Sequence, residues 1–309
     1  MAALTIAVLP GRMRALVQPL LPEWAEARWW NSSDELVALA PKAEIGWFDL
    51  HYKPPVLASV ASAKDLRWLN TAYAGVNWLP LADLERRGVA LTCGRGLTAT
   101  AVAEFAVMTM LTVAKAYPAV VGAQDRREFL DDAPGTRELA CSKSLILGQG
   151  AIGQAIDRML HGFGVMTETA RRSSGLGWKD RLGTFDWIVL ALPGTAETRG
   201  LIGAAELAAM KPEAVIVNFA RADIVDEPAL ISALRDKRIA AAVLDVTDPE
   251  PLLPDHPLWS LDNAHITMHL SGIPTPASLQ RAAERFARNC EHFRNGEPLE
   301  AKVDLKLGY

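Results

Sequence analysis

The chain alternates short apolar runs with longer amphipathic segments over most of its length. In the first hundred residues, four runs have the length and composition of strands, and each precedes a longer amphipathic segment: "LTIAVL", "EIGWF", "LRWLNT" and "VALTC". After residue 140 the alternation returns in "SLILG", "VMTETA", "DWIVLAL", "AVIVNFA", "AAVLDV" and "HITMHL". Repeated strand–helix units indicate parallel sheets with helices on both faces. The pattern therefore predicts an α/β protein with two doubly wound parallel-sheet domains, Rossmann-like or flavodoxin-like.

Two further segments are predicted to be long helices. Residues 98–117 are apolar on most sides, which is typical of a helix buried within a domain or across a subunit interface. Pro118 is expected to end this helix. The tail from about Thr275 is also predicted to be helical, with Gly296 as its stop, and it is too short for a third domain.

Composition excludes several classes of function. Half of the residues are apolar, 22% are charged and the net charge is −4, which argues against binding to nucleic acid or to a membrane surface. Cys93, Cys141 and Cys290 lie far apart, so we expect a reducing compartment and no metal site. Without a basic leader or a run of about 18 apolar residues, the chain is expected to be cytoplasmic.

The segment "SLILGQGAIGQAI", residues 144–156, places Gly148, Gly150 and Gly153 between an apolar strand and a helix. In a dinucleotide-binding turn, the first glycine makes the bend and the second lets the backbone approach a pyrophosphate. The third lets helix and strand pack closely, and the helix N-terminus favours the anion. The segment predicts a dinucleotide-binding loop, with a tight turn that binds no ligand as the alternative.

The next strand indicates which dinucleotide is bound. Such strands normally end in an acidic residue about 20 positions after the loop, which binds the adenosine ribose. Here Arg171, Arg172 and Ser173 occupy that place, although Glu168 lies close by. Guanidinium groups bind a 2′-phosphate through paired, charge-assisted hydrogen bonds. We therefore expect NADP(H) to be preferred, with NAD(H) and an ordinary solvated turn as the alternatives.

Reactive side chains follow three later strands. Ligands of doubly wound sheets bind beyond the carboxyl ends of the strands, where this chain places Arg221, then Asp245 and Glu250, then His269. Arg221 is suited to a carboxylate substrate, and His269 to proton transfer at neutral pH with Glu250 orienting its ring. Structural ion pairs are the alternative for each residue taken alone. Asp245 is a candidate acceptor for the cofactor's carboxamide, or a cap for the following turn.

His265 and His269 are four residues apart, as a metal-binding pair on a helix would be, so a metal site has to be considered. Ile266 and Thr267 between them are β-branched, so the segment is predicted to be a strand, in which four residues span roughly 13 Å. One ion cannot bridge that distance, and no metal is expected.

At these residues the chain resembles the D-isomer-specific 2-hydroxyacid dehydrogenases, especially the glyoxylate/hydroxypyruvate reductase branch. The resemblance runs through "AYAGVNWLPL", "TATAVAEFAV", "LGQGAIGQAI", "LPGTAETRGLI", "VIVNFARADIVDE", "AAAVLDVTDPEPLLPDHPLW" and "HITMHLSG". It implies a discontinuous substrate domain of residues 1–97 and 273–309, a dinucleotide-binding domain of residues 98–272, and an active-site cleft between them. It also implies that residues 98–117 form a dimerisation element, so a homodimer is expected.

The resemblance assigns roles to individual residues. Arg221 holds the carboxylate and the keto oxygen of the substrate, His269 is the acid/base, and Glu250 pairs with His269. The expected substrate contacts are completed by Ala74, Gly75, Val76 and Trp47, although Trp47 and Phe48 are alternatively core residues. The expected cofactor contacts are Thr100, Gly148, Gln149, Gly150, Ala151, Ile152, Gly153, Arg171, Arg172, Ser173, Leu192, Pro193, Thr198, Phe219, Ala220 and Asp245.

Two positions depart from the family's pattern. Ala222 replaces the usual glycine after the arginine, which would tilt the loop if that position required positive φ. Met268 replaces the usual proline before the histidine, which frees the backbone there. The predicted activity is reduction of a small 2-keto acid by NADPH. The alternatives are an NAD-dependent dehydrogenase of another 2-hydroxy acid and a dinucleotide-sensing interaction protein with little turnover.

Overall fold

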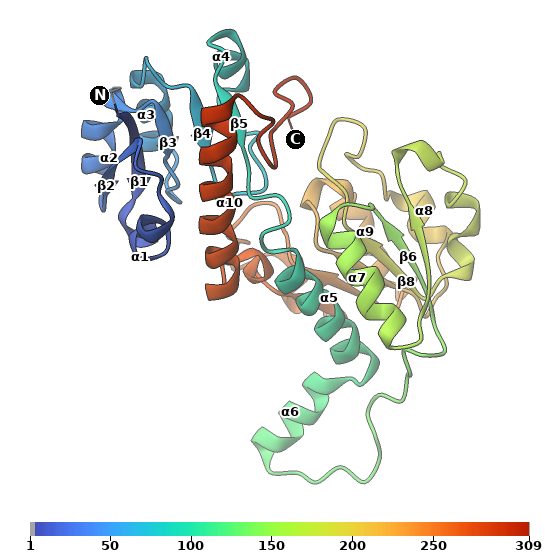
Figure 1. Ribbon diagram of the computed structural model, residues 1–309. Coiled ribbons are helices and arrows are strands. Elements are labelled where there is room, and N and C mark those ends of the chain that lie inside the picture. The colour runs from blue at the N-terminus through green and yellow to red at the C-terminus, as the bar shows by residue number, and fades with distance from the viewer. Residues whose placement is uncertain (1–3, 309) are drawn as a thin grey trace. The chain divides into compact units, whose positions relative to one another are not determined.

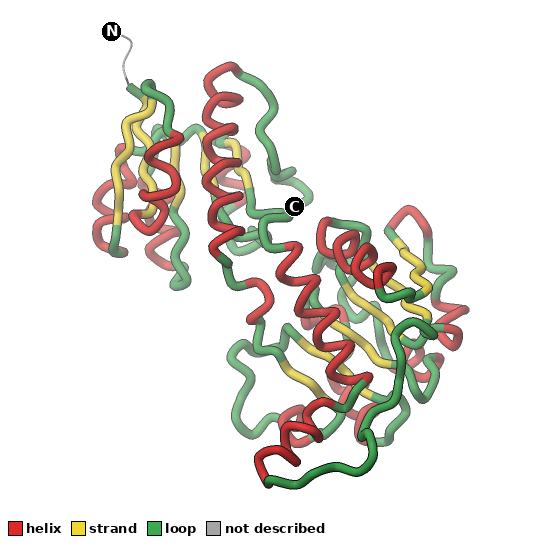
Figure 2. The backbone as a smooth tube through the Cα atoms, turned by 60° about the horizontal axis from the view of Figure 1, so that its bottom comes forward, coloured by secondary structure: helices red, strands yellow, loops and turns green. Residues whose placement is uncertain are grey.

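A computed structural model describes residues 4–308, whose named strands form two sheets with parallel pairing throughout (Figures 1 and 2). The chain divides into two compact units. Unit 1 contains Met1–Thr98 and Pro274–Tyr309, and unit 2 contains Ala99–Ile273. The α/β class with two parallel sheets, predicted from the alternating pattern, is confirmed.

Unit 1 is built on a five-stranded sheet of order β2-β1-β3-β4-β5. Its strands are β1 (Thr5–Pro10), β2 (Ala25–Trp30), β3 (Ile45–Trp47), β4 (Trp68–Asn70) and β5 (Ala90–Thr92). Its helices are α1 (Arg14–Val17), α2 (Ser33–Leu39), α3 (Pro54–Ser62), α4 (Leu81–Arg86) and α10 (Pro276–Asn295). The order reverses between β1 and β3, as in flavodoxin-like folds.

Strand β2 was not predicted from the sequence. Its sequence, "AEARWW", mixes charged and aromatic residues, and five of its six positions are at least partly exposed. It lies at the edge of the sheet and pairs only with β1. An edge strand needs no continuous apolar run, so its signal in the sequence is weak.

Helix α10 supplies the core on one face of this sheet (Figure 1). Its Phe286 lies 5.2 Å from the Trp47 ring and 5.0 Å from the Trp68 ring, measured between centroids. Trp47 is only 1% exposed and donates from Nε1 to Asp49 Oδ2 at 2.8 Å. The structure thus favours packing for Trp47 and Phe48, whereas a substrate contact of Trp47 stays a prediction.

The helical tail ends as the sequence predicts. Thr275 caps α10 by accepting from the Ser278 backbone N–H at 3.2 Å, and Gly296 ends it with φ of 71°. Positive φ is readily adopted by glycine, which explains the stop.

Unit 2 is built on a six-stranded sheet of order β11-β10-β9-β8-β6-β7. Its strands are β6 (Lys143–Leu147), β7 (Met166–Ala170), β8 (Trp187–Leu190), β9 (Val215–Asn218), β10 (Ala241–Leu244) and β11 (Ala264–Ile266). Its helices are α5 (Ala99–Ala114), α6 (Tyr117–Arg126), α7 (Ala151–Gly162), α8 (Ala204–Ala209) and α9 (Glu227–Arg235). Apart from the added β11, the order is that of unit 1, with its reversal between β6 and β8.

Both faces of this sheet are buried. Leu145 and Leu147 of β6 pack into the cluster beneath α8 and α9, whereas Ile146 packs into the cluster beneath α5 and α7. In β6, β8, β9 and β10, alternate residues thus enter opposite cores, which explains why these strands are almost continuously apolar.

The long helix predicted over residues 98–117 is two helices. Helix α5 ends at Ala114, Ala116 adopts a left-handed conformation with φ of 46°, and α6 begins at Tyr117. Pro118 therefore lies in the first turn of α6, where its missing N–H is tolerated, rather than ending α5. Within residues 4–308 no single helix passes the length and hydropathy test for a membrane span, although α5 and α6 pass it together across a 68° bend.

Candidate active site

The glycine loop joins β6 to α7 and leaves no room for larger residues at two positions. Gly148 has φ of 113°, and a Cβ there would lie 2.3 Å from the Ala191 carbonyl oxygen. A Cβ on Gly153 would lie 2.0 Å from the Gly148 carbonyl oxygen. These glycines are required by the fold itself, for the bend and for close packing of helix on strand.

Gly150 is different, because a Cβ there would meet no atom within 4 Å. It precedes the first turn of α7, where Ala151 and Ile152 lie. The first backbone N–H groups of a helix have no partner within the helix and attract anions. An open glycine before the N-terminus of a helix at a sheet reversal fits a dinucleotide pyrophosphate, so the residues present suit the cofactor.

The loop after β8 lies beside the glycine loop, on the other side of the reversal. Thr198 Oγ1 donates to the Pro193 carbonyl oxygen and accepts from the Thr195 backbone N–H, each at 2.8 Å. Thr198 thus shapes the turn that begins at Leu192 and Pro193. Gln149 of the glycine loop donates to the Thr169 hydroxyl of β7.

The end of β7 is exposed and basic. Arg172 pairs with Glu197 of the β8 loop at 2.6 Å, and its side chain is 75% exposed. Among residues 4–308, the Arg171 guanidinium has no hydrogen-bond or ion-pair partner. Glu168 pairs with Arg181 through both carboxylate oxygens, so its charge is already bound by a cation. Among the described residues, the end of β7 therefore carries one unpaired cation, Arg171, and a second, Arg172, that is paired with Glu197.

Arg221 follows β9 and is held through its backbone. Asn218 donates from Nδ2 to the Arg221 carbonyl oxygen at 2.9 Å and accepts from the Ala220 backbone N–H at 3.0 Å. Arg221 donates from Nη1 to the Ala220 carbonyl oxygen at 2.7 Å, and it remains exposed. Ala222 opens a short 3₁₀ turn and is not among the residues with positive φ, so the methyl group there creates no left-handed strain.

Gly194 gives Arg221 its space, which the sequence pattern did not reveal. A Cβ on Gly194 would lie 2.9 Å from Arg221 Cγ and 3.3 Å from its Cβ. The loops after β8 and β9 thus approach at this point. The position of Arg221 after β9 does not by itself predict that the loop after the neighbouring strand β8 needs a glycine.

Glu250 and His269 form a hydrogen-bonded pair. His269 Nδ1 lies 2.9 Å from Glu250 Oε2, and Glu250 Oε1 accepts from the Thr247 backbone N–H at 3.1 Å. The histidine side chain is 46% exposed, so its other ring nitrogen is accessible to a ligand. The pair joins the loop after β10 to the turn after β11.

The strand predicted over "HITMHL" ends at Ile266, so that expectation is corrected. Met268 and His269 both have positive φ, 53° and 55°, which no strand allows. The strand interpretation failed because β-branched Ile266 and Thr267 continue the apolar pattern past the true end. His265 stays within β11, where burial lowers the pKa of its imidazole.

Asp245 is 2% exposed and its carboxylate is occupied by nearby hydroxyl groups. Thr267 Oγ1 donates to Oδ1 at 2.6 Å, and Ser271 Oγ donates to Oδ2. Thr267 and Ser271 were missed in the sequence, because hydroxyl residues in a turn are common and carry no distinctive spacing.

Arg221, Asp245 and His269 follow β9, β10 and β11, which are neighbours in the sheet. Leu244 of β10 lies opposite both Asn218 of β9 and Ile266 of β11. The three residues therefore leave the same edge of unit 2, as do the glycine loop and the β8 loop. Phe219 and Ala220 are buried between them, and Thr100 is exposed at the start of α5.

In unit 1, the residues expected to contact substrate occupy an ordered loop after β4. Among the described residues, none accepts a hydrogen bond from the backbone N–H of Ala74, Gly75 or Val76. The Gly75 carbonyl oxygen accepts from Trp78 Nε1 at 3.1 Å, and Lys53 Nζ lies 4.2 Å from the Trp78 ring centroid. Unpaired N–H groups in series can bind an anion.

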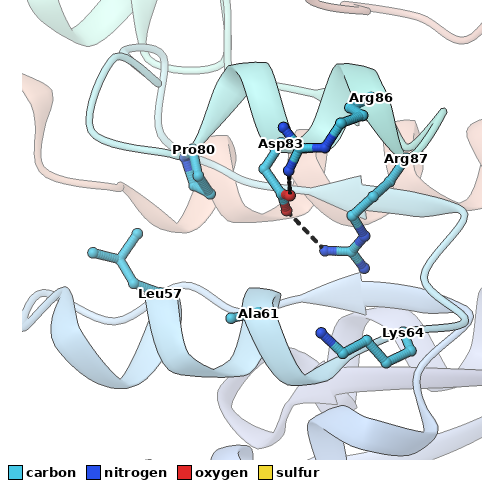
Figure 3. A pocket seen from close by; sticks show the side chains of 7 residues that line it. All are labelled: Leu57, Ala61, Lys64, Pro80, Asp83, Arg86 and Arg87. Atoms are coloured by element: carbon cyan, nitrogen blue, oxygen red, sulfur yellow. Dashed lines mark hydrogen bonds and ion pairs between the residues drawn. The ribbon is translucent and has the colours of Figure 1, made fainter.

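A hollow in unit 1 lies between α3 and α4 (Figure 3). Its basic residues include Arg86 and Arg87, which both pair with Asp83. Arg87 also donates to the carbonyl oxygens of Val60 and Ala63. The donors of both arginines are thus already bound, whereas Lys64, which also lines the hollow, has no hydrogen-bond or ion-pair partner among residues 4–308.

Comparison with known proteins gives a consistent picture. Residues 107–271 match the family described as D-isomer specific 2-hydroxyacid dehydrogenase, NAD binding domain. A glyoxylate reductase/hydroxypyruvate reductase of Mus musculus is 33% identical over 79% of this chain and 79% of its own.

Two solved structures are similar over nearly the whole chain. A D-isomer specific 2-hydroxyacid dehydrogenase family protein from Aeromonas salmonicida subsp. salmonicida A449 has 28% identity and a TM-score of 0.86, covering 98% of this chain and 100% of that one. A D-isomer specific 2-hydroxyacid dehydrogenase from Xanthobacter autotrophicus Py2, in complex with NADPH and MES, has 27% identity and a TM-score of 0.79, covering 100% of both chains.

Proposed function

Because the chain belongs to the D-isomer-specific 2-hydroxyacid dehydrogenase family, glyoxylate/hydroxypyruvate reductase-like branch, we propose that it reduces a small 2-keto acid with NADPH. The proposed substrates are of the glyoxylate or hydroxypyruvate type, and the proposed product is the D-2-hydroxy acid where reduction creates a stereocentre, as it does for hydroxypyruvate but not for glyoxylate. The proposal rests on the His269–Glu250 pair, at 2.9 Å, on the sheet edge that also carries the glycine loop.

In the proposed mechanism, the glycine loop at Gly148, Gly150 and Gly153 would hold NADPH, which when bound would supply the hydride needed at the keto carbon. Arg221 binds the substrate carboxylate and keto oxygen through parallel N–H donors and so fixes the face presented for reduction. Protonated His269 donates a proton to the keto oxygen as it becomes a hydroxyl group. Glu250 accepts from Nδ1, which orients the ring and leaves Nε2 to carry that proton.

Steady-state turnover tests the reaction class. The purified protein is expected to oxidise NADPH in the presence of glyoxylate or hydroxypyruvate, and chiral analysis of glycerate from hydroxypyruvate should give the D isomer. Pyruvate, phenylpyruvate and 2-ketogluconate complete the panel. Dinucleotide binding without turnover of any keto acid would contradict the proposal and favour a dinucleotide-sensing protein.

We expect Arg171 and Arg172 to set the preference for NADPH. Replacing both with alanine should weaken NADPH binding by about tenfold or more while NADH binding changes little, because only NADPH carries the 2′-phosphate. Titration of protein fluorescence with each cofactor measures the two dissociation constants. Arg235→Ala is a matched control, since this exposed arginine ends α9 and therefore lies at the opposite edge of the sheet. Equal weakening for both cofactors would assign the arginines no part in the preference.

A homodimer remains the proposed assembly. Helices α5 and α6 and the segment after them expose large apolar side chains, at Met108, Tyr117, Val121, Phe129 and Leu130. Phe129, at 95% exposure, is the most open of these, and aromatic residues are enriched at protein interfaces. Light scattering should give twice the mass of 33.5 kDa, and Phe129→Asp should raise the dimer dissociation constant about tenfold or more. A wild-type mass equal to one chain at micromolar concentration would rule this assembly out.

A further inference from the structure

His269 lies in a turn that ordinary residues rarely adopt. Met268 and His269 have φ of 53° and 55°, so two successive residues with side chains are left-handed. A Cβ in this region approaches the following carbonyl oxygen, which is unfavourable at each residue. Such a conformation persists only where the surrounding structure holds it.

Three groups hold this turn, all through Asp245. Thr267, directly before the left-handed pair, donates from Oγ1 to Asp245 Oδ1 at 2.6 Å. Ser271, two residues after His269, donates from Oγ to Asp245 Oδ2 and from its backbone N–H to Oδ1 at 3.4 Å. The His269 backbone N–H donates to the Asp245 carbonyl oxygen at 2.5 Å. Asp245 thus accepts hydrogen bonds from the residues at both ends of the turn, Thr267 and Ser271, and from His269 in its middle.

Asp245 is a firm anchor because of its place in the sheet. It directly follows β10, which pairs with β9 on one side and β11 on the other. Asp245 and Ser271 are each 2% exposed, whereas the His269 side chain is 46% exposed. The buried carboxylate therefore connects an exposed, strained turn to a strand that is paired on both sides.

We propose that Thr267 and Ser271 are positioning residues, which act through Asp245 to hold His269 in the left-handed turn that presents its ring to Glu250. We call the hydroxyl groups of Thr267 and Ser271, together with the Asp245 carboxylate that accepts from both, the hydroxyl clamp. The inference rests on the proposed function, since it takes His269 as the acid/base. Neither hydroxyl group takes part in proton transfer to the substrate; each acts only by fixing the imidazole.

Thr267→Val removes one clamp hydroxyl and keeps the shape of the side chain, and Thr267→Ser is its matched control. We expect Thr267→Val to lower kcat about tenfold or more, because misplacing a catalytic group by about 1 Å costs up to about 10²-fold. Thr267→Ser should retain most of the wild-type kcat. Cofactor dissociation constants, measured by fluorescence, should be unchanged in both variants. Thr267→Val with wild-type kcat would overturn the proposal.

A double-mutant cycle separates positioning from general stability. If the clamp acts by presenting His269 to Glu250, Thr267→Val should have little further effect on kcat in a Glu250→Gln background. Additive losses would overturn the proposal, because they would show that Thr267 acts independently of the pair. In the wild-type background, the double variant Ser271→Ala/Thr267→Val should have a lower kcat than either single variant. If its kcat equals that of Thr267→Val, Ser271 has no positioning role.

Met268 provides an independent test of the turn itself. Proline has φ near −65° and cannot adopt the 53° found at Met268, whereas alanine can with limited strain. Met268→Pro introduces the residue that the family usually carries before the histidine; in this chain, whose backbone is left-handed at that position, it should lower kcat about as much as Thr267→Val, and Met268→Ala should not. Full activity in Met268→Pro would show that the left-handed turn is not needed to place His269.

One measurement keeps this inference distinct from the proposed function. The imidazole resonances of His269 can be assigned by their absence in His269→Gln and followed by NMR without any substrate. We expect them to shift in Thr267→Val and to stay near wild type in Thr267→Ser. If His269→Gln retains full turnover, the proposed function fails, yet these resonances still report whether the clamp places the ring. Unchanged resonances in Thr267→Val would overturn the clamp alone.

Discussion

Replacing His269 with glutamine is expected to lower kcat for 2-keto acid reduction by about 10²–10⁴-fold, the usual contribution of a positioned acid. Glutamine keeps a polar group of similar size but cannot donate a proton as imidazolium does. The ring is 46% exposed and hydrogen-bonded only to Glu250 among the described residues, so its loss should leave the core intact. Steady-state kinetics with hydroxypyruvate and NADPH measure the change.

The control for this variant is His161→Gln. His161 is 60% exposed in the last turn of α7, at the end of the helix remote from the glycine loop. We expect wild-type kcat in this control and an unchanged NADPH dissociation constant in both variants. If His269→Gln instead weakened NADPH binding as much as it lowered kcat, the histidine would serve the cofactor rather than proton transfer.

Replacing Arg221 with glutamine should lower kcat/KM by about 10²-fold. A hydrogen bond to a charged group contributes about 1.5–3 kcal/mol, and a bidentate contact with a carboxylate lies at the upper end of that range. Arg221 is exposed, and among residues 4–308 its side chain donates only to the carbonyl oxygen of Ala220, so the change should have little effect on folding. The loss should appear for every keto acid, because each carries the carboxylate.

Arg221→Lys distinguishes a fork of donors from a simple positive charge. Lysine keeps the charge but lacks the planar pair of N–H groups, so we expect it to recover only a small part of the lost kcat/KM. Full recovery would mean that charge alone suffices. An Arg221→Gln enzyme with unchanged kcat/KM would remove the arginine from the proposed mechanism.

The sequence predicts the fold well because the information is local and repeated. Most of the buried parallel strands are apolar throughout, and ten of the eleven strands within residues 4–308 coincide with strand candidates recognised in the sequence. The exception, β2, lies at an edge, and its sequence alternates alanine with charged residues before two tryptophans. The break between α5 and α6 was missed since the sequence stays apolar where Ala116 turns left-handed.

The candidate site could be predicted only in part. The glycine loop, Arg221, Glu250 and His269 stand out because each follows an apolar run, and strands of one sheet bring their ends to one edge. The left-handed turn at Met268 and the close approach of Gly194 to Arg221 depend on contacts between loops distant in sequence. No pattern along the chain encodes such contacts.

The position of α10 near the end of the chain affects how the protein folds during synthesis. Phe286 stacks near Trp47 and Trp68, yet it follows them by more than 200 residues along the chain, with all of unit 2 in between. On the ribosome, the part of the N-terminal sheet that α10 covers must therefore stay uncovered while unit 2 emerges and folds. Nascent chains that stop before residue 276 are expected to present this tryptophan surface to chaperones, whereas full-length chains conceal it.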